Sequence, residues 1–424
     1  MRASKRILLY GGRLVLPDRF VEPGWVLIQE GTILDVSAAE RLPSADEYWD
    51  VQGGYVGPGL IDLHIHGSAG VDLLTATADD LRRWARFLLR HGVTRFLPTL
   101  VPADPAQYAR VRAVLAEYVP EQDRDPGAAS ILGVHFEGPF VSPRRPGALN
   151  PRFFRTFRSL RDVGELLTWD IPARPFVWMM TLAPEIEGGL ALIEELQQRG
   201  FRLAIGHSEA SFELCEAAAG RGAAHVTHFP NALAPLHHRQ LGVTGWALLS
   251  ETVTLDLIAD GHHLDPRMIA LVRKVVGSDR LALISDAIAA AGLGDGRYEI
   301  WGETIRVVNG RTENAAGNLA GSVITLLDAV RHLVQWGIPL LEAIRMATLV
   351  PARVLGLEGE FGSLAPGKRA DLLVLDERLR PRLVVHEGEI VRFSEDSSAP
   401  PLAREETWAR PSGERLISPP REDD

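Results

Sequence analysis

Two histidines, His64 and His66, stand two residues apart in the otherwise mostly apolar run from Gly57 to Gly67. In a β-strand, residues at this spacing point to the same face. Imidazole is the commonest metal ligand among side chains, and burying two imidazoles is costly unless they are hydrogen-bonded or coordinated. The pair therefore predicts a metal site at the end of a strand. The structural alternative is that one histidine caps a turn and the other packs in the core.

Other apolar segments of the chain also end in side chains that bind metals or move protons. Ligands from separate strand ends can converge on one divalent cation, and zinc with nitrogen and oxygen ligands turns bound water into a nucleophile near neutral pH. Each residue alone has a plain alternative, such as a hydrogen-bonded surface position or a helix N-cap. Together they predict a metal-dependent hydrolase. These residues are Glu137, His207, His228 and Asp286.

The elements that must position these residues alternate between apolar strands and amphipathic helices from residue 57 to residue 356. This alternation predicts an α/β fold, a TIM-like (β/α)8 barrel with its chemistry at the C-terminal strand ends. A doubly wound sheet is the alternative, although no Gly-x-Gly-x-x-Gly follows the first strand. The expected strands are 60–66, 95–100, 131–137, 176–182, 202–207, 224–228, 253–258 and 281–286. The expected helices are 79–91, 105–118, 188–199, 211–220, 265–276, 322–337 and 340–355.

The two ends of the chain have a different pattern from the middle. Residues 1–56 and 357–394 both contain short apolar runs separated by Gly, Pro and Asp turn signals. They predict one small β-sandwich domain built from both termini. Residues 395–424 are polar and rich in proline, which predicts a disordered tail.

Composition limits the partners and the compartment. The 424 residues exceed the roughly 250–300 that one core usually holds. A net charge of −10 argues against nucleic acid as a partner. No stretch approaches the ~20 apolar residues of a membrane span, and the apolar run near the start is too short for a signal peptide. The single cysteine, Cys215, reads as a core residue and fits a reducing cytoplasm.

Several motifs carry a resemblance to a known family over about residues 57–376. Pro-Gly-Leu-Ile-Asp with His-x-His marks a broad superfamily, and the other motifs together are much narrower: Glu137-Gly-Pro-Phe, Thr181-Leu-Ala-Pro-Glu, His228-Phe-Pro-Asn-Ala and Leu319-Ala-Gly-Ser. On these motifs the chain resembles the N-acetylglucosamine-6-phosphate deacetylases of the amidohydrolase superfamily.

The resemblance implies a role for each matched residue. Glu137, His207 and His228 are the expected ligands of the main metal, and Asp286 is the expected acid/base. His64 and His66 would form a second metal position, which some family members keep. The expected substrate-binding residues are Ala148, Asn231, Ala232, Arg239, His263, Leu319, Ala320 and Gly321.

The resemblance also implies a reaction, a cofactor and an assembly. The expected reaction hydrolyses the acetamide of N-acetylglucosamine 6-phosphate to glucosamine 6-phosphate and acetate. Metal-bound hydroxide would attack, with Asp286 as general base and then acid. The expected cofactor is Zn²⁺, with Fe²⁺ or another divalent ion as alternatives, at one or two ions per subunit. A homodimer is expected, with the loop near Arg239 reaching the neighbouring site.

One position departs from the family. Where relatives have a polar side chain that helps to polarise the acetyl carbonyl, this chain has Leu149. A leucine donates no hydrogen bond, so we expect a lower rate, compensation by a second metal at His64 and His66, or a shifted substrate. The alternative substrates are N-acetylgalactosamine 6-phosphate or an unphosphorylated N-acyl compound. A further alternative is a sugar-phosphate binder without catalysis, although such a protein has no need of Asp286.

Overall fold

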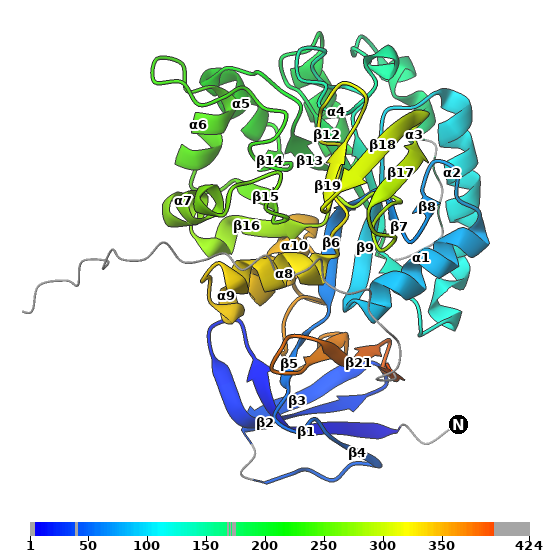
Figure 1. Cartoon of the computed structure of the whole chain (residues 1–424), viewed down its shortest axis with the longest axis vertical. Helices are drawn as coiled ribbons and strands as arrows, with labels where there is room; N and C mark the ends of the chain where they lie inside the picture. Colours follow the sequence, from blue (N-terminus) through cyan, green and yellow to red (C-terminus); the bar gives the residue numbers. More distant parts are fainter. Residues whose placement is uncertain (1–4, 39–40, 168, 170, 172–174, 394–424) are drawn as a thin grey trace, which may run out of the picture.

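The computed structural model describes residues 5–38, 41–167, 169, 171 and 175–393. A barrel of strands surrounded by helices stands on a smaller sheet, which contains the first and last strands of the described chain (Figure 1). The predicted tail, 395–424, lies outside the described residues.

Eight parallel strands form the barrel, as predicted. Each strand pairs with its neighbour in parallel, and β6 pairs with β9. The ring closes between its last and first strands, where the backbone N–H of Asp286 donates to the carbonyl of His64 at 2.9 Å. The strands are β6 (Leu60–Ile65), β9 (Val93–Leu100), β11 (Gly133–Glu137), β12 (Val177–Leu182), β13 (Arg202–Ile205), β14 (Ala223–Val226), β15 (Thr254–Ile258) and β16 (Leu281–Ile284).

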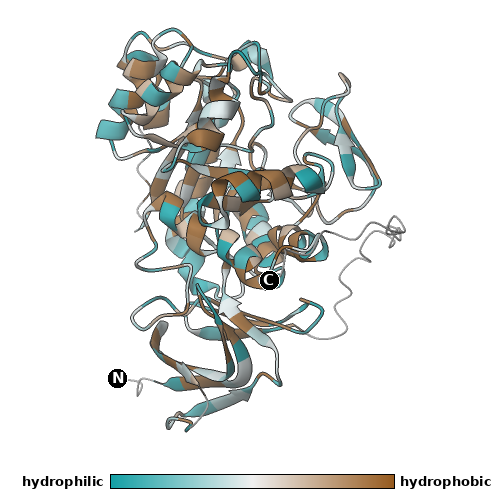
Figure 2. Ribbon diagram, turned by 90° about the vertical axis from the view of Figure 1, so that its left-hand side faces the viewer, coloured by the Kyte–Doolittle hydropathy of each residue, from teal (hydrophilic) through white to brown (hydrophobic). Residues whose placement is uncertain are grey.

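The barrel strands are apolar because both of their faces are covered. Every residue of β6 and β9 is buried, as expected for a parallel sheet with helices outside and packed side chains inside. Hydrophobic residues are concentrated in the strands and on the inner sides of the helices (Figure 2). One buried cluster joins six barrel strands to each other and to helix α10 (Leu349–Leu355). It includes Leu63, Leu97, Met179, Ile258, Ile284 and Val350.

The helices begin and end where the sequence supplies caps. Thr77 and Asp80 form a capping box at the start of α1, which satisfies backbone donors that have no partner inside the helix. None of the helices in the described ranges is long and apolar enough to cross a membrane. The other helices before α10 are α1 (Ala78–Arg90), α2 (Pro105–Tyr118), α3 (Gly164–Leu167), α4 (Gly189–Gln198), α5 (Phe212–Ala219), α6 (Gly242–Leu249), α7 (Pro266–Val276), α8 (Leu326–Gln335) and α9 (Leu340–Met346).

The helix expected over residues 340–355 is two helices, α9 and α10. In a continuous helix the ring of Pro351 would clash with the carbonyl of Ala347, four residues earlier. The structure breaks the helix there, and Thr348 has a non-helical backbone. The carbonyl of Ala347 instead accepts the N–H of Ile61 at 2.9 Å. The carbonyl freed by the break therefore joins the first barrel strand to the last helices.

A small antiparallel sheet that the sequence analysis did not predict follows β16. It consists of β17 (Gly296–Ile300), β18 (Glu303–Val308) and β19 (Arg311–Glu313). In Figure 1 these yellow-green strands are drawn over the upper part of the barrel. Shorter strands are β7 (Gly67–Ser68), β8 (Val71–Asp72) and β10 (Ser130–Ile131).

The small sheet is built from both ends of the chain, as predicted. Its order is β22-β21-β20-β5-β1-β2-β3, with β4 also paired to β1. Side chains from most of these strands bury one apolar cluster, separate from the barrel core. The predicted domain boundaries at residues 56, 356 and 394 stay predictions. The strands are β1 (Arg6–Val15), β2 (Phe20–Gln29), β3 (Thr32–Ala38), β4 (Glu47–Asp50), β5 (Tyr55–Pro58), β20 (Leu372–Leu375), β21 (Pro381–His386) and β22 (Glu389–Arg392).

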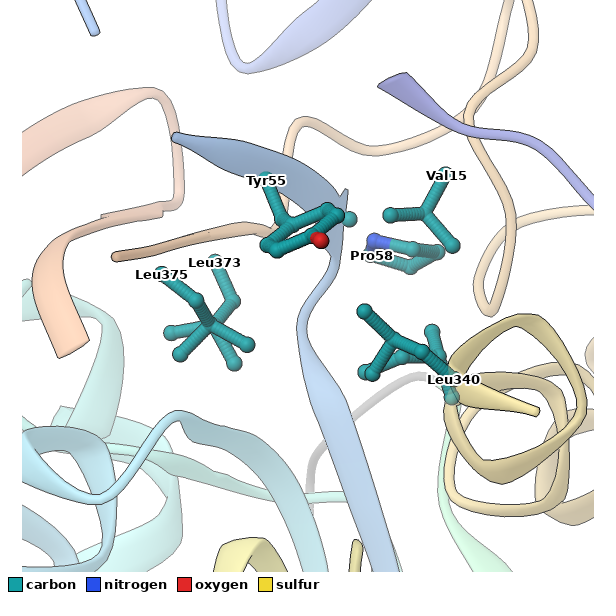
Figure 3. Close-up of a pocket in the computed structure, with 8 residues that line it drawn as sticks. Val15, Tyr55, Pro58, Leu340, Leu373 and Leu375 are labelled. Atoms are coloured by element: carbon teal, nitrogen blue, oxygen red, sulfur yellow. The ribbon is translucent and has the colours of Figure 1, made fainter. Parts of the chain in front are cut away.

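Apolar contacts and one buried ion network join the small sheet to the barrel. Figure 3 shows the apolar side, where residues of the sheet, including Val15 and Leu373, face Leu340 of α9. On the polar side, Nε of Arg95 from β9 donates to Asp371 Oδ2 at 2.6 Å, and its other end pairs with Glu387. The guanidinium is thus the shared counter-charge of two carboxylates from the small sheet.

Removing this counter-charge should destabilise the protein. Replacing Arg95 with alanine leaves Asp371 without its counter-charge, while Glu387 keeps its ion pair with Arg369. Breaking a buried pair in this way costs about 3–5 kcal/mol. The measurement is urea unfolding. Arg267, whose pair with Asp265 is largely exposed, is the control, and its alanine variant should stay close to wild type. Equal effects of the two substitutions would show that the buried network does not stabilise the junction.

Candidate metal centre

The residues predicted to bind metal come together at one end of the barrel. His64 lies in β6 and His66 directly follows it, while Glu137 is the last residue of β11. The remaining three residues, His207, His228 and Asp286, follow β13, β14 and β16 by two residues each. All six side chains are buried. The C-terminal strand ends thus form one polar centre, which is where a barrel of this type places its chemistry.

The first group of potential ligands is Glu137, His207 and His228. The Oε1 atom of Glu137 lies 2.8 Å from Nε2 of His207 and 3.0 Å from Nε2 of His228. The two Nε2 atoms are 3.2 Å apart. Three ligand atoms from three different strands therefore face a single point.

The second group is His64, His66 and Asp286. The Nε2 atoms of the two histidines are 3.2 Å apart, and Asp286 Oδ1 lies 3.1 Å from that of His66. The second carboxylate oxygen of Glu137, Oε2, lies 3.4 Å from His66 and 3.6 Å from His64. Glu137 is therefore shared, with one oxygen turned to each group.

The hydrogen bonds at the far side of the rings show that this centre fits a divalent cation. The Nδ1 atoms of His207, His228 and His66 lie 2.8, 3.2 and 3.1 Å from backbone carbonyl oxygens. Each Nδ1 must carry the proton to donate there, so each neutral ring turns an Nε2 lone pair inward. Lone pairs that face one another at 3.2 Å repel unless a cation lies between them. Nitrogen and carboxylate ligands fixed from behind in this way suit zinc and other divalent metals.

The electrostatics of the centre also favour positive charge. Burial alone would raise the pKa of Glu137, but the charge of His64 and hydrogen bonds from His207 and His228 outweigh it and hold the pKa well below its ordinary value. For His228, burial lowers the pKa, but the Glu137 carboxylate outweighs it and raises the pKa to about 9. Burial also opposes ionisation of Asp286, yet the charge of His64 and a hydrogen bond from His66 lower its pKa. Both carboxylates are therefore ionised at neutral pH.

Three of the six residues have an unusual backbone. His207, His228 and Asp286 have φ values of 47°, 34° and 48°, in the left-handed region that non-glycine residues rarely adopt. Surrounding hydrogen bonds hold this geometry. The N–H of Ser322 donates to the carbonyl of Asp286 at 2.7 Å, and the N–H of His228 donates to Asp256. At these three strand ends the strain falls on residues of the centre.

A buried polar layer beneath the centre was not predicted from the sequence. His135 contacts the hydroxyl of Thr181 at 2.8 Å, and that hydroxyl lies 2.6 Å from the hydroxyl of Thr227. Asp256 contacts the His225 ring at 2.9 Å while it also holds His228. A carboxylate in the middle of an apolar strand, as at Asp256, is the signal that could have identified this layer, because such a charge needs a buried partner.

Several predicted substrate residues adjoin the centre. Asn231 and Ala232 follow His228, and the Asn231 amide donates to the His228 carbonyl at 3.1 Å. Gly321 lies so close to Asp286 that an added Cβ would meet the Asp286 carbonyl at 2.8 Å. Ala320 is buried beside it, and Leu319 precedes it in the same loop.

The loop over residues 145–150 covers the first group of ligands. A Cβ added to Gly147 would lie 3.2 Å from the His207 ring, and Ala148 packs on the apolar cluster that includes Ala320. Leu149 is only 6% exposed and belongs to the main core. The loop thus approaches His207 through Gly147, while the Leu149 side chain packs in the core.

Arg239 and His263 lie on two other loops of the barrel. Arg239 is exposed, and its guanidinium lies 2.8 Å from Nε2 of His238. His263 is largely buried, and its Nδ1 contacts Asp260 at 2.7 Å. Among the described residues, no hydrogen bond or ion pair joins either side chain to the six residues of the centre.

The comparisons with known proteins agree with this geometry. The model of the amidohydrolase family matches residues 55–399. N-acetylgalactosamine-6-phosphate deacetylase of Escherichia coli O157:H7 is 36% identical over 375 residues, which cover 88% of this chain and 97% of that protein. N-acetylglucosamine-6-phosphate deacetylase of Vibrio furnissii is 37% identical over 319 residues, 75% of this chain and 78% of that one. The chain is a member of the N-acetylglucosamine-6-phosphate deacetylase family of amidohydrolases.

Solved structures of N-acetylglucosamine-6-phosphate deacetylases share the whole architecture. A variant of the Mycobacterium smegmatis enzyme, in complex with N-acetyl-D-glucosamine-6-phosphate, is 34% identical with a TM-score of 0.83, covering 92% of this chain and 100% of that one. The Pasteurella multocida enzyme is 27% identical with a TM-score of 0.84 and the same coverage. The deacetylase family therefore accounts for both the barrel and the small sheet.

Metal binding to this centre should release protons. With its pKa at about 9, His228 is protonated at pH 7.5 in the metal-free protein, and it must lose that proton to become a ligand. The affinity for Zn²⁺ should fall about tenfold for each pH unit below pH 9, for each proton that the metal displaces. Calorimetric titration of chelator-treated protein with Zn²⁺ in buffers of different ionisation enthalpy measures the protons released. A binding heat that is the same in every buffer would contradict the prediction.

Proposed function

We propose that the protein hydrolyses the acetamide of N-acetylglucosamine 6-phosphate to glucosamine 6-phosphate and acetate. The observation that carries this proposal is the buried centre in which Glu137 is shared between two histidine pairs and Asp286 stands beside it. The family membership narrows the substrate to an N-acyl amino sugar phosphate. Amide hydrolysis needs an activated water, a polarised carbonyl and a proton for the departing amine.

The chain's own residues divide these tasks. A divalent ion bound here would lower the pKa of water and polarise the acyl carbonyl. Asp286 is ionised because its imidazole neighbours lower its pKa, so it can accept the proton of the attacking water. The same carboxyl then donates that proton to the sugar nitrogen as the C–N bond breaks. The left-handed backbone of Asp286, whose carbonyl accepts the N–H of Ser322, keeps the carboxylate turned toward the centre.

The phosphate would be held away from the centre by groups on the barrel loops. Arg239 can form charge-assisted hydrogen bonds to phosphate oxygens, with His263 and the backbone around Asn231 and Ala232 as further partners. Ala148 and the loop Leu319–Gly321 would contact the sugar. These assignments follow the family motifs, and the closeness of Gly321 to Asp286 supports the placement of the sugar loop.

The proposed metal is Zn²⁺, with Fe²⁺ as the alternative, because nitrogen and carboxylate ligands suit both. Two ions per subunit are supported by the shared carboxylate of Glu137, which turns one oxygen to each histidine pair. A second ion at His64 and His66 would also polarise the acyl carbonyl, a task that Leu149 cannot perform. We also propose that the protein works in the cytoplasm, which the single buried Cys215 supports.

A second candidate substrate is the galacto epimer, N-acetylgalactosamine 6-phosphate. The E. coli relative that carries this activity in its name is as similar as the glucosamine enzymes, and Leu149 changes the surroundings of the acyl group. An unphosphorylated N-acyl compound is a third candidate, outside the substrate class of the relatives, because Leu149 also changes the surroundings of the acyl group.

A substrate panel tests these alternatives. Metal-loaded protein should release acetate from N-acetylglucosamine 6-phosphate faster than from the galacto epimer or from either sugar without phosphate. Asp286→Asn should lose about 10²–10⁴-fold in rate, since it removes the general acid and base. Arg239→Ala should raise KM for the phosphorylated sugars and leave the unphosphorylated ones unchanged. No turnover of any phosphorylated sugar by metal-loaded enzyme would refute the proposal, and a chelated sample is the control.

We also propose a homodimer in which the loop near Arg239 reaches the neighbouring site. The supporting observation is a group of exposed apolar residues on this loop and on α6 and α7, which lie side by side. Large apolar patches on a soluble protein mark interaction sites. The residues are Leu236, Leu241, Leu249, Met268, Leu271 and Val275.

A mixed dimer tests this arrangement. Subunits with Arg239→Ala and subunits with Asp286→Asn carry different tags, are co-expressed, and are purified through both tags. If Arg239 serves the partner's site, each mixed dimer has one complete site and regains about half of the wild-type activity. If Arg239 serves its own subunit, no complete site exists, and the mixed dimer shows only the raised KM of the Arg239→Ala parent. The two parent homodimers are the controls.

A further inference from the structure

A tryptophan stands at the tip of the unpredicted hairpin, directly against the second histidine pair. The pairing of Ile300 with Glu303 leaves Trp301 and Gly302 as a two-residue turn between β17 and β18. Both have positive φ, 55° and 79°. Turns of this kind strongly prefer Asn, Asp or Gly, and a bulky residue at positive φ is an outlier. Such an outlier persists only where surrounding contacts compensate for it.

The contacts of the indole lead to the centre. Its ring meets the His66 ring edge to face, with centroids 5.0 Å apart and planes at 80°. The indole is also a neighbour of the Asp72 carboxylate, whose Oδ1 accepts the N–H of Leu74 at 2.8 Å. It packs on the apolar cluster formed by residues around Ile288, Ile300 and Ala320. The hairpin tip is therefore fixed between His66 and the segment that follows Asp286.

The second histidine pair has fewer hydrogen bonds behind it than the first. Both His207 and His228 are held through Nδ1 by backbone carbonyls. In the second pair only His66 has this support, from Thr99, while Nδ1 of His64 is buried and has no hydrogen-bond partner among the described residues. One hydrogen bond leaves a ring free to tilt about that bond. The unsupported His64 ring packs edge to face against His66, so both rings of this pair depend on the orientation of His66. The indole of Trp301 packs against His66 and can fix that orientation.

We propose that Trp301 is a positioning residue for the second metal position, where its indole holds the His66 imidazole with Nε2 turned toward Asp286 and Glu137. This rests on the proposed function only in that His64 and His66 bind an ion. Within the described part of the chain, the indole makes its ring contact with His66 and none with the first group of ligands. Its removal should therefore weaken one ion and spare the other.

Trp301→Asn separates positioning from folding, because asparagine suits a left-handed turn better than tryptophan does. Chelator-treated protein is titrated with Zn²⁺ against a chromophoric competitor. We expect the more weakly bound ion, at His64 and His66, to lose about 10–100-fold in affinity. This is the usual effect of removing a residue that orients a metal ligand. The tighter ion should keep its affinity, and the melting temperature of the metal-free protein should not fall. Trp301→Phe, which keeps an aromatic edge, should lie between asparagine and wild type.

Two references make the result decisive. His66→Asn removes a ligand of the second position, so the Trp301→Asn isotherm should shift toward that of His66→Asn. Trp49→Phe, on the small sheet against Arg392, should match wild type. A wild-type isotherm for Trp301→Asn, equal weakening of both ions, or a wild-type protein that binds only one ion would each overturn the inference. Two-ion binding without turnover of any sugar would sink the proposed function and leave this inference standing.

Discussion

The carboxylate of Glu137 is the constraint on which the centre depends. Its two oxygens face two pairs of imidazoles whose Nε2 atoms are each 3.2 Å apart. Burying this carboxylate is unfavourable by itself, and the surrounding histidines lower its pKa despite the burial. Because the imidazoles come from three separate strand ends, the charge of Glu137 can be satisfied only if the barrel closes in the correct register. The chemistry of the site and the closure of the fold are therefore the same requirement.

The backbone meets this requirement at the strand ends. The hydrogen bond from the Asp286 N–H to the His64 carbonyl closes the barrel. It also places Asp286 and His64, two members of the second group, side by side. Left-handed φ values at His207, His228 and Asp286 turn these side chains inward just after their strands stop. Such strain is tolerated because buried partners, such as Asp256 behind His228, over-determine the geometry. The barrel strands thus provide the stability, and the residues that follow them carry the backbone strain.

Much of this could be predicted from the sequence, for a physical reason. An apolar run that ends in His or a carboxylate indicates both a strand and its C-terminal end. The eight barrel strands and the six residues of the centre were therefore predicted together. The break after Ala347 was missed, although Pro351 carries its signal. The β17–β19 sheet was missed because the turn at Trp301 lacks the Asn or Gly that usually marks a hairpin. Arg239 and His263 lie on loops, which strand patterns do not describe.

The apolar residue Leu149 bears on the role of the hairpin that carries Trp301. Leu149 is packed in the main core while its loop is held over His207, so no small rearrangement brings a hydrogen-bond donor to that place. In the proposed reaction, polarisation of the acyl carbonyl would then depend on the metal centre, where His64, His66 and Asp286 gather. The second group has one histidine without hydrogen-bond support and an indole that packs against the other. Packing by Trp301 therefore supports a histidine pair that has fewer hydrogen bonds than the first pair.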